Sequence, residues 1–129
     1  MAVFGHFENS EETPAGLIAR SIEVARAIIV TVRQSVNPVL HELGLPNLQC
    51  AAGLNYGSVA IVHTGIRGEN DMVTLGSTAN LAAKIEGKIP AWKIGVGHDA
   101  HTLLWPDAWF DRWLNSKKVN DYKYYVLDT

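Results

Sequence analysis

The stretch NDMVTLGSTANLAAKIEGK, Asn70 to Lys88, places an amide and a cation four residues apart. These residues are Asn80 and Lys84, and they stand among alanines in a segment that begins like a strand and ends like a helix. Residues four apart lie on one face of a helix, so the pair would present a hydrogen-bond donor and a positive charge side by side. The small alanines would leave room for another molecule to approach.

The elements that must position this pair follow from apolar periodicity and from turn residues. We expect a helix over Ala15–Leu43 that is kinked or divided at Pro38 and ended by Gly44 and Pro46. We expect the runs Leu48–Leu54 and Ser58–His63 to form a hairpin through Asn55–Gly57, followed by a polar loop over Thr64–Asp71. The other expected elements are strands at Met1–Gly5, Met72–Leu75, Ile89–Val96, Ala108–Leu114 and Tyr122–Leu127, and helices from Ser77 to Gly87 and from Asp99 to Leu104.

Interleaved strands and helices with hairpins predict an α+β fold with a mainly antiparallel sheet. The 129 residues fit a single domain over 1–129. The net charge of -2 and the scattered basic residues give no attraction to nucleic acid, and no apolar run is long enough to cross a membrane. The single cysteine, Cys50, fits a reducing cytoplasm.

Four stretches together resemble the class III nucleotide cyclases, the family of the adenylate and guanylate cyclase catalytic domains. They are MAVFG from Met1, AAGLNYGSVAIVHTG from Ala51, DMVTLGSTANLAAKIEG from Asp71 and KKVNDYKYYVL from Lys117. The third stretch is the specific one. The resemblance implies a ferredoxin-like fold, flanked by helices, that lacks its first strand and first helices.

The resemblance also implies roles for the polar side chains. In the family, the ribose 3′-oxygen of a nucleoside triphosphate attacks the α-phosphate and expels pyrophosphate. Asn80 would position the ribose, Lys84 would stabilise the charge that develops on the phosphoryl group, and Lys117 or Lys118 would bind phosphate. Two domains pair head to tail in the family, which implies a homodimer with composite sites at its interface.

Two departures from the family pattern bear on the substrate. Lys84 stands where most members have arginine, which keeps the charge but loses the two-pronged hydrogen bonding. Val73 stands where the family reads a purine base, and valine cannot hydrogen-bond a base, so Asp71 is the nearest polar substitute. These features are similar to the pyrimidine cyclases of Pycsar anti-phage systems, which make cyclic UMP or cyclic CMP. We therefore expect UTP or CTP as substrate, with an adenylate or guanylate cyclase as the alternative.

The metal ligands of the family have no counterpart in this sequence. The family holds Mg²⁺ or Mn²⁺ with two aspartates, and by register both would lie upstream of Met1. We expect no metal ligand within the chain, since His98 and His101 have the spacing of a metal pair but no third ligand nearby. The chain is then either a truncated cyclase, which we favour, or a catalytically inactive cyclase-like module.

Overall fold

The computed structural model describes residues 11–66, 69–104, 117–119 and 121–129. The strands expected at Met1–Gly5 and Ala108–Leu114 lie outside these residues. In chain order the elements are α1 (Pro14–Thr31), the π-helix η1 (Val32–Val36), α2 (Asn37–Glu42), β1 (Ala52–Leu54), β2 (Ala60–Ile66), β3 (Glu69–Leu75), α3 (Ser77–Glu86), β4 (Lys93–Gly97), α4 (His98–Leu104), β5 (Lys117–Val119) and β6 (Tyr122–Asp128).

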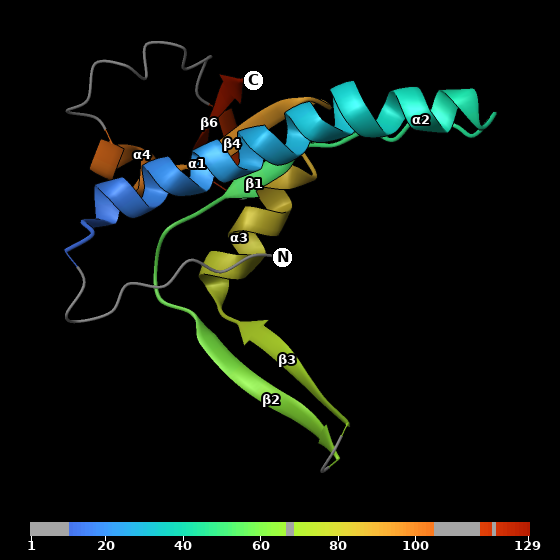
Figure 1. Cartoon of the computed structure of the whole chain (residues 1–129). Helices are drawn as coiled ribbons and strands as arrows, with labels where there is room; N and C mark the ends of the chain where they lie inside the picture. The colour runs from blue at the N-terminus through green and yellow to red at the C-terminus, as the bar shows by residue number, and fades with distance from the viewer. Residues whose placement is uncertain (1–10, 67–68, 105–116, 120) are drawn as a thin grey trace.

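A long helical rod, formed by α1, η1 and α2, crosses one face of the sheet (Figure 1). Thr13 caps its start, because the hydroxyl of Thr13 accepts a hydrogen bond from the Gly16 N–H at 3.1 Å. Pro14 occupies the first turn, as expected, since its missing N–H would have no partner there.

The division of this helix was predicted at Pro38, but it takes the form of the π-helix η1 just before that residue. The Asn37 N–H bonds to the carbonyl of Val32, five residues earlier. Proline has no N–H and its ring crowds the carbonyl four residues before it, which a wider turn relieves. Gly44, in a left-handed conformation with φ 70°, then turns the chain after α2 as predicted.

The main sheet has the strand order β1-β4-β6-β5. β1 and β4 are parallel, whereas β4–β6 and β5–β6 are antiparallel. The fold is therefore α+β with a mainly antiparallel sheet, as predicted. β1 forms one edge of this sheet within the described part of the chain.

The hairpin predicted between the runs on either side of Asn55–Gly57 is wrong. β1 pairs with β4 in the main sheet, whereas β2 pairs with β3 in a separate two-stranded sheet. The Asn55 side chain explains the difference, because it bonds to distant groups and not within a local turn. It accepts a hydrogen bond from the Tyr122 hydroxyl and donates one to the Thr78 carbonyl.

The polar loop predicted over Thr64–Asp71 is also wrong, because most of it lies in paired strands. Thr64 is opposite Asp71 and Ile66 is opposite Glu69 in the β2–β3 ribbon. This ribbon projects away from the body below α3 (Figure 1). A projecting ribbon has no face that must pack on a core, so a polar sequence does not prevent its strands from pairing.

The helices α3 and α4 agree with the prediction within a residue or two at each end. β4 starts at Lys93 and not at Ile89, because Trp92 adopts a φ of 68° that breaks an extended strand. The Trp92 N–H donates to the Cys50 carbonyl at 2.7 Å, which fixes the approach to the sheet.

Two helical layers cover opposite faces of the main sheet. Apolar residues of α1 and α4 pack on the first face against Ile94, Val96 and Leu127. On the second face, Ile85 of α3 packs against a smaller set of strand residues, Val119, Tyr124 and Val126. Within the described residues, no helix has the length and apolar character needed to traverse a bilayer.

Candidate functional site

The helix α3 carries the polar pair that the sequence singled out. Gly76 precedes it with a φ of 134°, a conformation that favours glycine. Asn80 and Lys84 are both exposed and lie one turn apart on the same side, whereas Ile85 is completely buried. The structure therefore brings the predicted amide and cation together on a solvent-facing surface.

The alanines beside this pair face a different neighbour. Ala79, Ala82 and Ala83 line an apolar groove of about 440 Å³ together with Gly53 of β1 and Ile28 of α1. Because a helix turns about 100° per residue, this side of α3 lies roughly a third of a turn from Asn80 and Lys84. The small alanines thus open space between α3, β1 and α1, and neither Asn80 nor Lys84 lines this groove.

Close contact with two paired glycines holds α3 against the sheet. Gly53 of β1 and Gly95 of β4 are partners in the parallel register. A Cβ atom at Gly53 would collide with the main chain of α3 at Ala82 and Glu86, and a Cβ at Gly95 would collide with the Ile85 side chain. Glycine at position 53 therefore lets the α3 backbone contact β1, and glycine at position 95 leaves space for the Ile85 side chain.

The two residues predicted to read the base lie on β3, which leads directly into α3. Val73 is half-buried and stands opposite Val62, while Asp71 stands opposite Thr64. They are two residues apart in this strand.

The two lysines predicted to bind phosphate lie on β5. Lys117 pairs with Tyr124 and Lys118 pairs with Lys123. Tyr124 and Val119 pack with Ile85 of α3, so positions 117 and 119 belong to the sheet face that α3 covers. Position 118 belongs to the opposite face.

Two guanylyl cyclases are among the solved structures that share this fold. The guanylyl cyclase Cya2 superposes with a TM-score of 0.72 at 17% identity, over 95% of this chain and 61% of that chain. The catalytic core of a rhodopsin-guanylyl cyclase with converted specificity, solved in complex with ATPαS, superposes with a TM-score of 0.65 at 19% identity, over 94% of this chain and 64% of that chain. The fold is that of the guanylyl cyclases. The chain spans less than two thirds of the length of either protein, and no family model and no curated protein matches its sequence.

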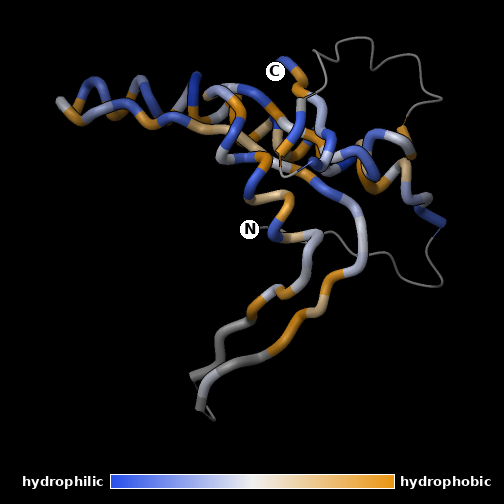
Figure 2. The backbone as a smooth tube through the Cα atoms, turned by 180° about the vertical axis from the view of Figure 1, so that it is seen from behind, coloured by the Kyte–Doolittle hydropathy of each residue, from blue (hydrophilic) through white to orange (hydrophobic). Residues whose placement is uncertain are grey.

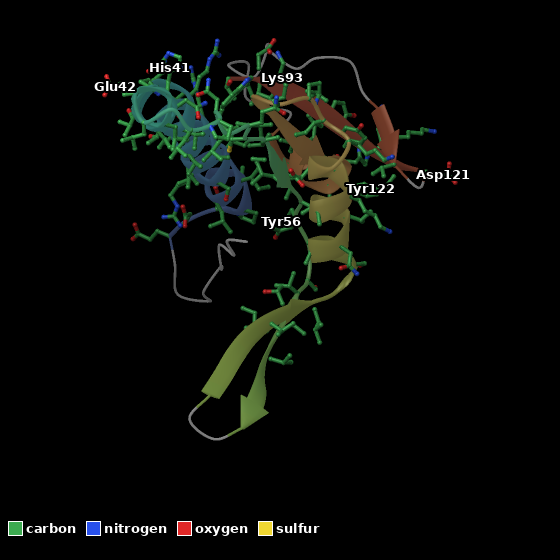
Figure 3. All side chains as sticks on the ribbon, turned by 90° about the vertical axis from the view of Figure 1, so that its right-hand side faces the viewer. His41, Glu42, Tyr56, Lys93, Asp121 and Tyr122 are labelled. Atoms are coloured by element: carbon green, nitrogen blue, oxygen red, sulfur yellow. The ribbon has the colours of Figure 1, made fainter. Side chains whose placement is uncertain are left out.

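Within this cyclase fold, a polar cluster that the sequence analysis did not find joins β1, α3, α4 and β6. The Tyr122 hydroxyl lies 2.8 Å from Asp99 Oδ2 and 3.0 Å from Asn55 Oδ1, and it accepts the Asp99 N–H at 3.1 Å. Figure 3 shows Tyr122 beside α3. Partial burial, reinforced by Asp99, raises the pKa of Tyr122, so its hydroxyl stays protonated at neutral pH.

The sequence holds only a weak signal for this cluster. Gly97 ends β4 between the two strands, and a Cβ atom there would collide with Asn55 Oδ1 and approach Tyr122 Cε1 to 3.2 Å. A glycine at a strand end suggests close approach of another group, but it does not identify residues 67 positions apart in the chain.

The two histidines of α4, His98 and His101, lie in different surroundings. His101 is buried and its ring stacks on Tyr125 at a centroid distance of 3.6 Å, whereas His98 is exposed. Burial, with the nearby charges of His98 and Lys123, lowers the pKa of His101. The described residues bring no three His, Cys, Asp or Glu side chains into a group that could hold a metal ion.

Proposed function

We propose that this chain is a catalytic part of a nucleotide cyclase that converts UTP or CTP into the 3′,5′-cyclic monophosphate and pyrophosphate. One observation carries the proposal. Over 95% of its length the chain superposes on a guanylyl cyclase, and its exposed helix face carries the amide and the cation expected to contact a triphosphate.

The proposed reaction forms one bond and breaks one. The ribose 3′-oxygen bonds to the α-phosphorus, the bond from that phosphorus to the bridging oxygen breaks, and pyrophosphate leaves while the 3′-hydroxyl proton passes to solvent. Asn80 orients the ribose through its amide, and Lys84 offsets the charge that grows on the transferring phosphoryl oxygens. Both roles need exposed side chains on one face, which α3 provides.

The strand register favours Lys117 over Lys118 as the phosphate ligand. Position 117 pairs with Tyr124 on the sheet face that α3 covers, and position 118 pairs with Lys123 on the other face. Position 117 thus lies on the same side of the sheet as the helix that carries Asn80 and Lys84. We therefore propose that Lys117 binds the phosphates of the substrate.

The preference for a pyrimidine rests on Val73 and Asp71. Val73 lies in β3, three residues before Gly76, and offers the base no hydrogen bond. Asp71 lies two residues before it in this strand and can accept a hydrogen bond from an amino or imino group of a base. The product acts, in this proposal, as a second messenger of anti-phage defence in the cytoplasm.

A second copy of the chain completes the proposed site. Asn80 and Lys84 face solvent and do not line the groove beside α3. The projecting β2–β3 ribbon carries apolar residues along both strands (Figure 2), and Ile61 and Leu75 are about half exposed, at 50% and 51%. Exposed apolar side chains on a projecting ribbon are suited to contact a partner, and we propose that this partner is a second protomer.

A purine cyclase is the competing function, because the two solved structures named above are guanylyl cyclases and one of them holds ATPαS. To separate the two, the protein is incubated with each of the four nucleoside triphosphates, with Mg²⁺ or Mn²⁺. Products are identified by chromatography and mass spectrometry. We expect cyclic UMP or cyclic CMP. Formation of cyclic AMP or cyclic GMP alone would overturn the pyrimidine preference. If none of the four triphosphates gave a cyclic product, the proposed cyclase activity would be overturned.

The adjacent lysines provide a matched pair for the same assay. Lys117→Ala should raise KM for the triphosphate about tenfold through the loss of one charged hydrogen bond, while Lys118→Ala should leave it nearly unchanged. Equal effects of the two substitutions would contradict the assignment of Lys117.

A further inference from the structure

We propose that Tyr122 is a positioning residue that ties the helix carrying Asn80 and Lys84 to the strand pair carrying Lys117. Its effect on catalysis rests on the proposed function, whereas its effect on the placement of α3 does not. Tyr122 is not among the residues predicted to contact the substrate, so it would act only through the groups to which it is hydrogen-bonded.

The first link runs from the β5–β6 pair. Tyr122 opens β6 and pairs with Val119, two residues after Lys117. Strand pairing fixes the position of the tyrosine relative to the lysine, since residues in register cannot shift singly. The hydroxyl of Tyr122 is therefore held at a fixed place relative to the proposed phosphate ligand.

The second link crosses the sheet. β6 and β1 are not neighbours, because β4 lies between them in the strand order. The Tyr122 hydroxyl nevertheless reaches Asn55 Oδ1, just beyond the end of β1, at 3.0 Å. It can do so because β4 ends in Gly97. The absence of a side chain there leaves space for the Asn55 amide and the Tyr122 ring to meet.

The third link reaches the first turn of α3. Asn55 Nδ2 donates to the Thr78 carbonyl at 3.4 Å, and Thr78 Oγ1 donates to the Ser58 carbonyl at 3.0 Å. Thr78 precedes Asn80 by two residues, so these bonds fix the first turn of α3, which leads into the proposed ribose contact.

The orientation of the Asn55 amide depends on Tyr122. The Asn55 oxygen faces a hydroxyl donor and the Asn55 nitrogen faces a carbonyl acceptor, which defines a single arrangement of the amide. The Tyr122 proton has a second acceptor in Asp99 Oδ2, and the Asp99 N–H completes the set by donating to the hydroxyl. Removing the hydroxyl leaves Asn55 Oδ1 without its donor and weakens the hold of Asn55 on Thr78.

The experiment compares Tyr122→Phe with Tyr124→Phe. Tyr124 lies in the same strand, is buried beside Ile85 of α3 and makes no hydrogen bond through its hydroxyl within the described residues. Amide hydrogen exchange is followed by mass spectrometry at residue resolution in the intact protein. In Tyr122→Phe we expect the amides of Asn80 and Leu81 to exchange about tenfold faster, as the loss of one hydrogen bond implies, while those of α1 stay unchanged.

A second variant tests the path without touching the tyrosine. Gly97→Ala places a methyl group against Asn55 Oδ1 and should accelerate exchange in the first turn of α3 in the same way. Unchanged exchange in α3 in both Tyr122→Phe and Gly97→Ala would overturn the proposal, as would equal acceleration in α1 and α3 or an equal effect of Tyr124→Phe.

Activity gives the readout that a merely structural hydroxyl would not move. Tyr122→Phe should lower kcat about tenfold with little change in melting temperature, while Tyr124→Phe should not lower it. If the unsubstituted protein forms no cyclic nucleotide, the proposed function fails while the exchange result still decides the positioning role. If exchange in α3 does not change, the positioning role fails while the cyclase assay stands.

Discussion

The helices α1 and α3 cover opposite faces of one sheet, but they are held there in different ways. α1 buries several large side chains, among them Ile18, Ile22 and Ile29, against apolar residues of the strands. α3 buries one side chain, Ile85, which lies against Gly95, and its backbone rests on Gly53. Hydrogen bonds through Thr78 then hold its first turn.

This difference explains how one fold can contain both a stabilising helix and a helix with an exposed polar surface. A helix held by large apolar residues on one side gains its stability from their burial. A helix held by close backbone contact and a few hydrogen bonds needs fewer such residues, so more of its surface is free for polar groups. Asn80 and Lys84 occupy such a surface on α3.

The largest expected effect tests the packing of α1. Ile22 is 2% exposed, and Ile22→Ala should lower the free energy of unfolding by about 4 kcal/mol, because it removes buried methyl groups and leaves a cavity. Chemical denaturation measures the change. The matched variant Ile28→Ala, at a position that is 52% exposed, should cost less than about 1 kcal/mol. Similar losses for the two variants would contradict the described packing of α1.

A somewhat smaller loss is expected when the glycine contact of α3 is filled. Gly53→Ala should lower the free energy of unfolding by about 3 kcal/mol, because the new methyl group meets main-chain atoms of α3 that cannot move aside singly. Gly87→Ala is the control, since a Cβ there has ordinary contacts of 3.6 Å or more, and it should change stability by less than about 0.5 kcal/mol. If Gly53→Ala proves as mild as its control, α3 does not rest on β1 as described.

The polar surface of α3 should affect activity and not stability. Asn80→Ala should lower kcat of the intact enzyme about 100-fold through the loss of a positioned hydrogen-bond donor. Its melting temperature should change little because Asn80 is exposed. Asn47→Ala, at another exposed asparagine, should change neither quantity. Parallel losses of activity and melting temperature in Asn80→Ala would make Asn80 a structural residue.

The smallest expected effect is the pH dependence of stability that comes from His101 of α4. The pKa of His101 is lowered from 6.5, chiefly by burial, so near and below that pH the unfolded chain binds a proton that the folded chain does not. The stability that depends on neutral His101 is thus complete above pH 6.5 and is lost as the pH falls through the folded-state pKa.

Urea denaturation at about pH 7.5 and about pH 5.5 measures this loss. His101→Phe, which keeps an aromatic ring against Tyr125, should lose less stability on acidification than the unsubstituted protein. His41→Gln, at an exposed position in α2, should lose as much as the unsubstituted protein. An unchanged pH dependence in His101→Phe would show that His101 does not titrate in this way.

Local patterns in the sequence predicted the elements whose boundaries are marked by residues nearby in the chain. The end of the first helix at Gly44 and the spans of α3 and α4 are fixed by residues within a few positions of each boundary. The hairpin through Asn55–Gly57 was wrong because the Asn55 amide bonds to Thr78 and Tyr122. The loop over Thr64–Asp71 was wrong because pairing in a projecting ribbon leaves little trace in polarity.

The candidate site was likewise predicted only in part from the sequence. The sequence alone placed Asn80 and Lys84 on one face of a helix, because a separation of four is a property of helical geometry. Only the tertiary structure placed the alanines toward the groove and brought Tyr122 to Asn55 across Gly97. Local spacing fixes what a single helix presents, whereas contacts between residues far apart in the chain depend on strand order and register, which the folded chain sets as a whole.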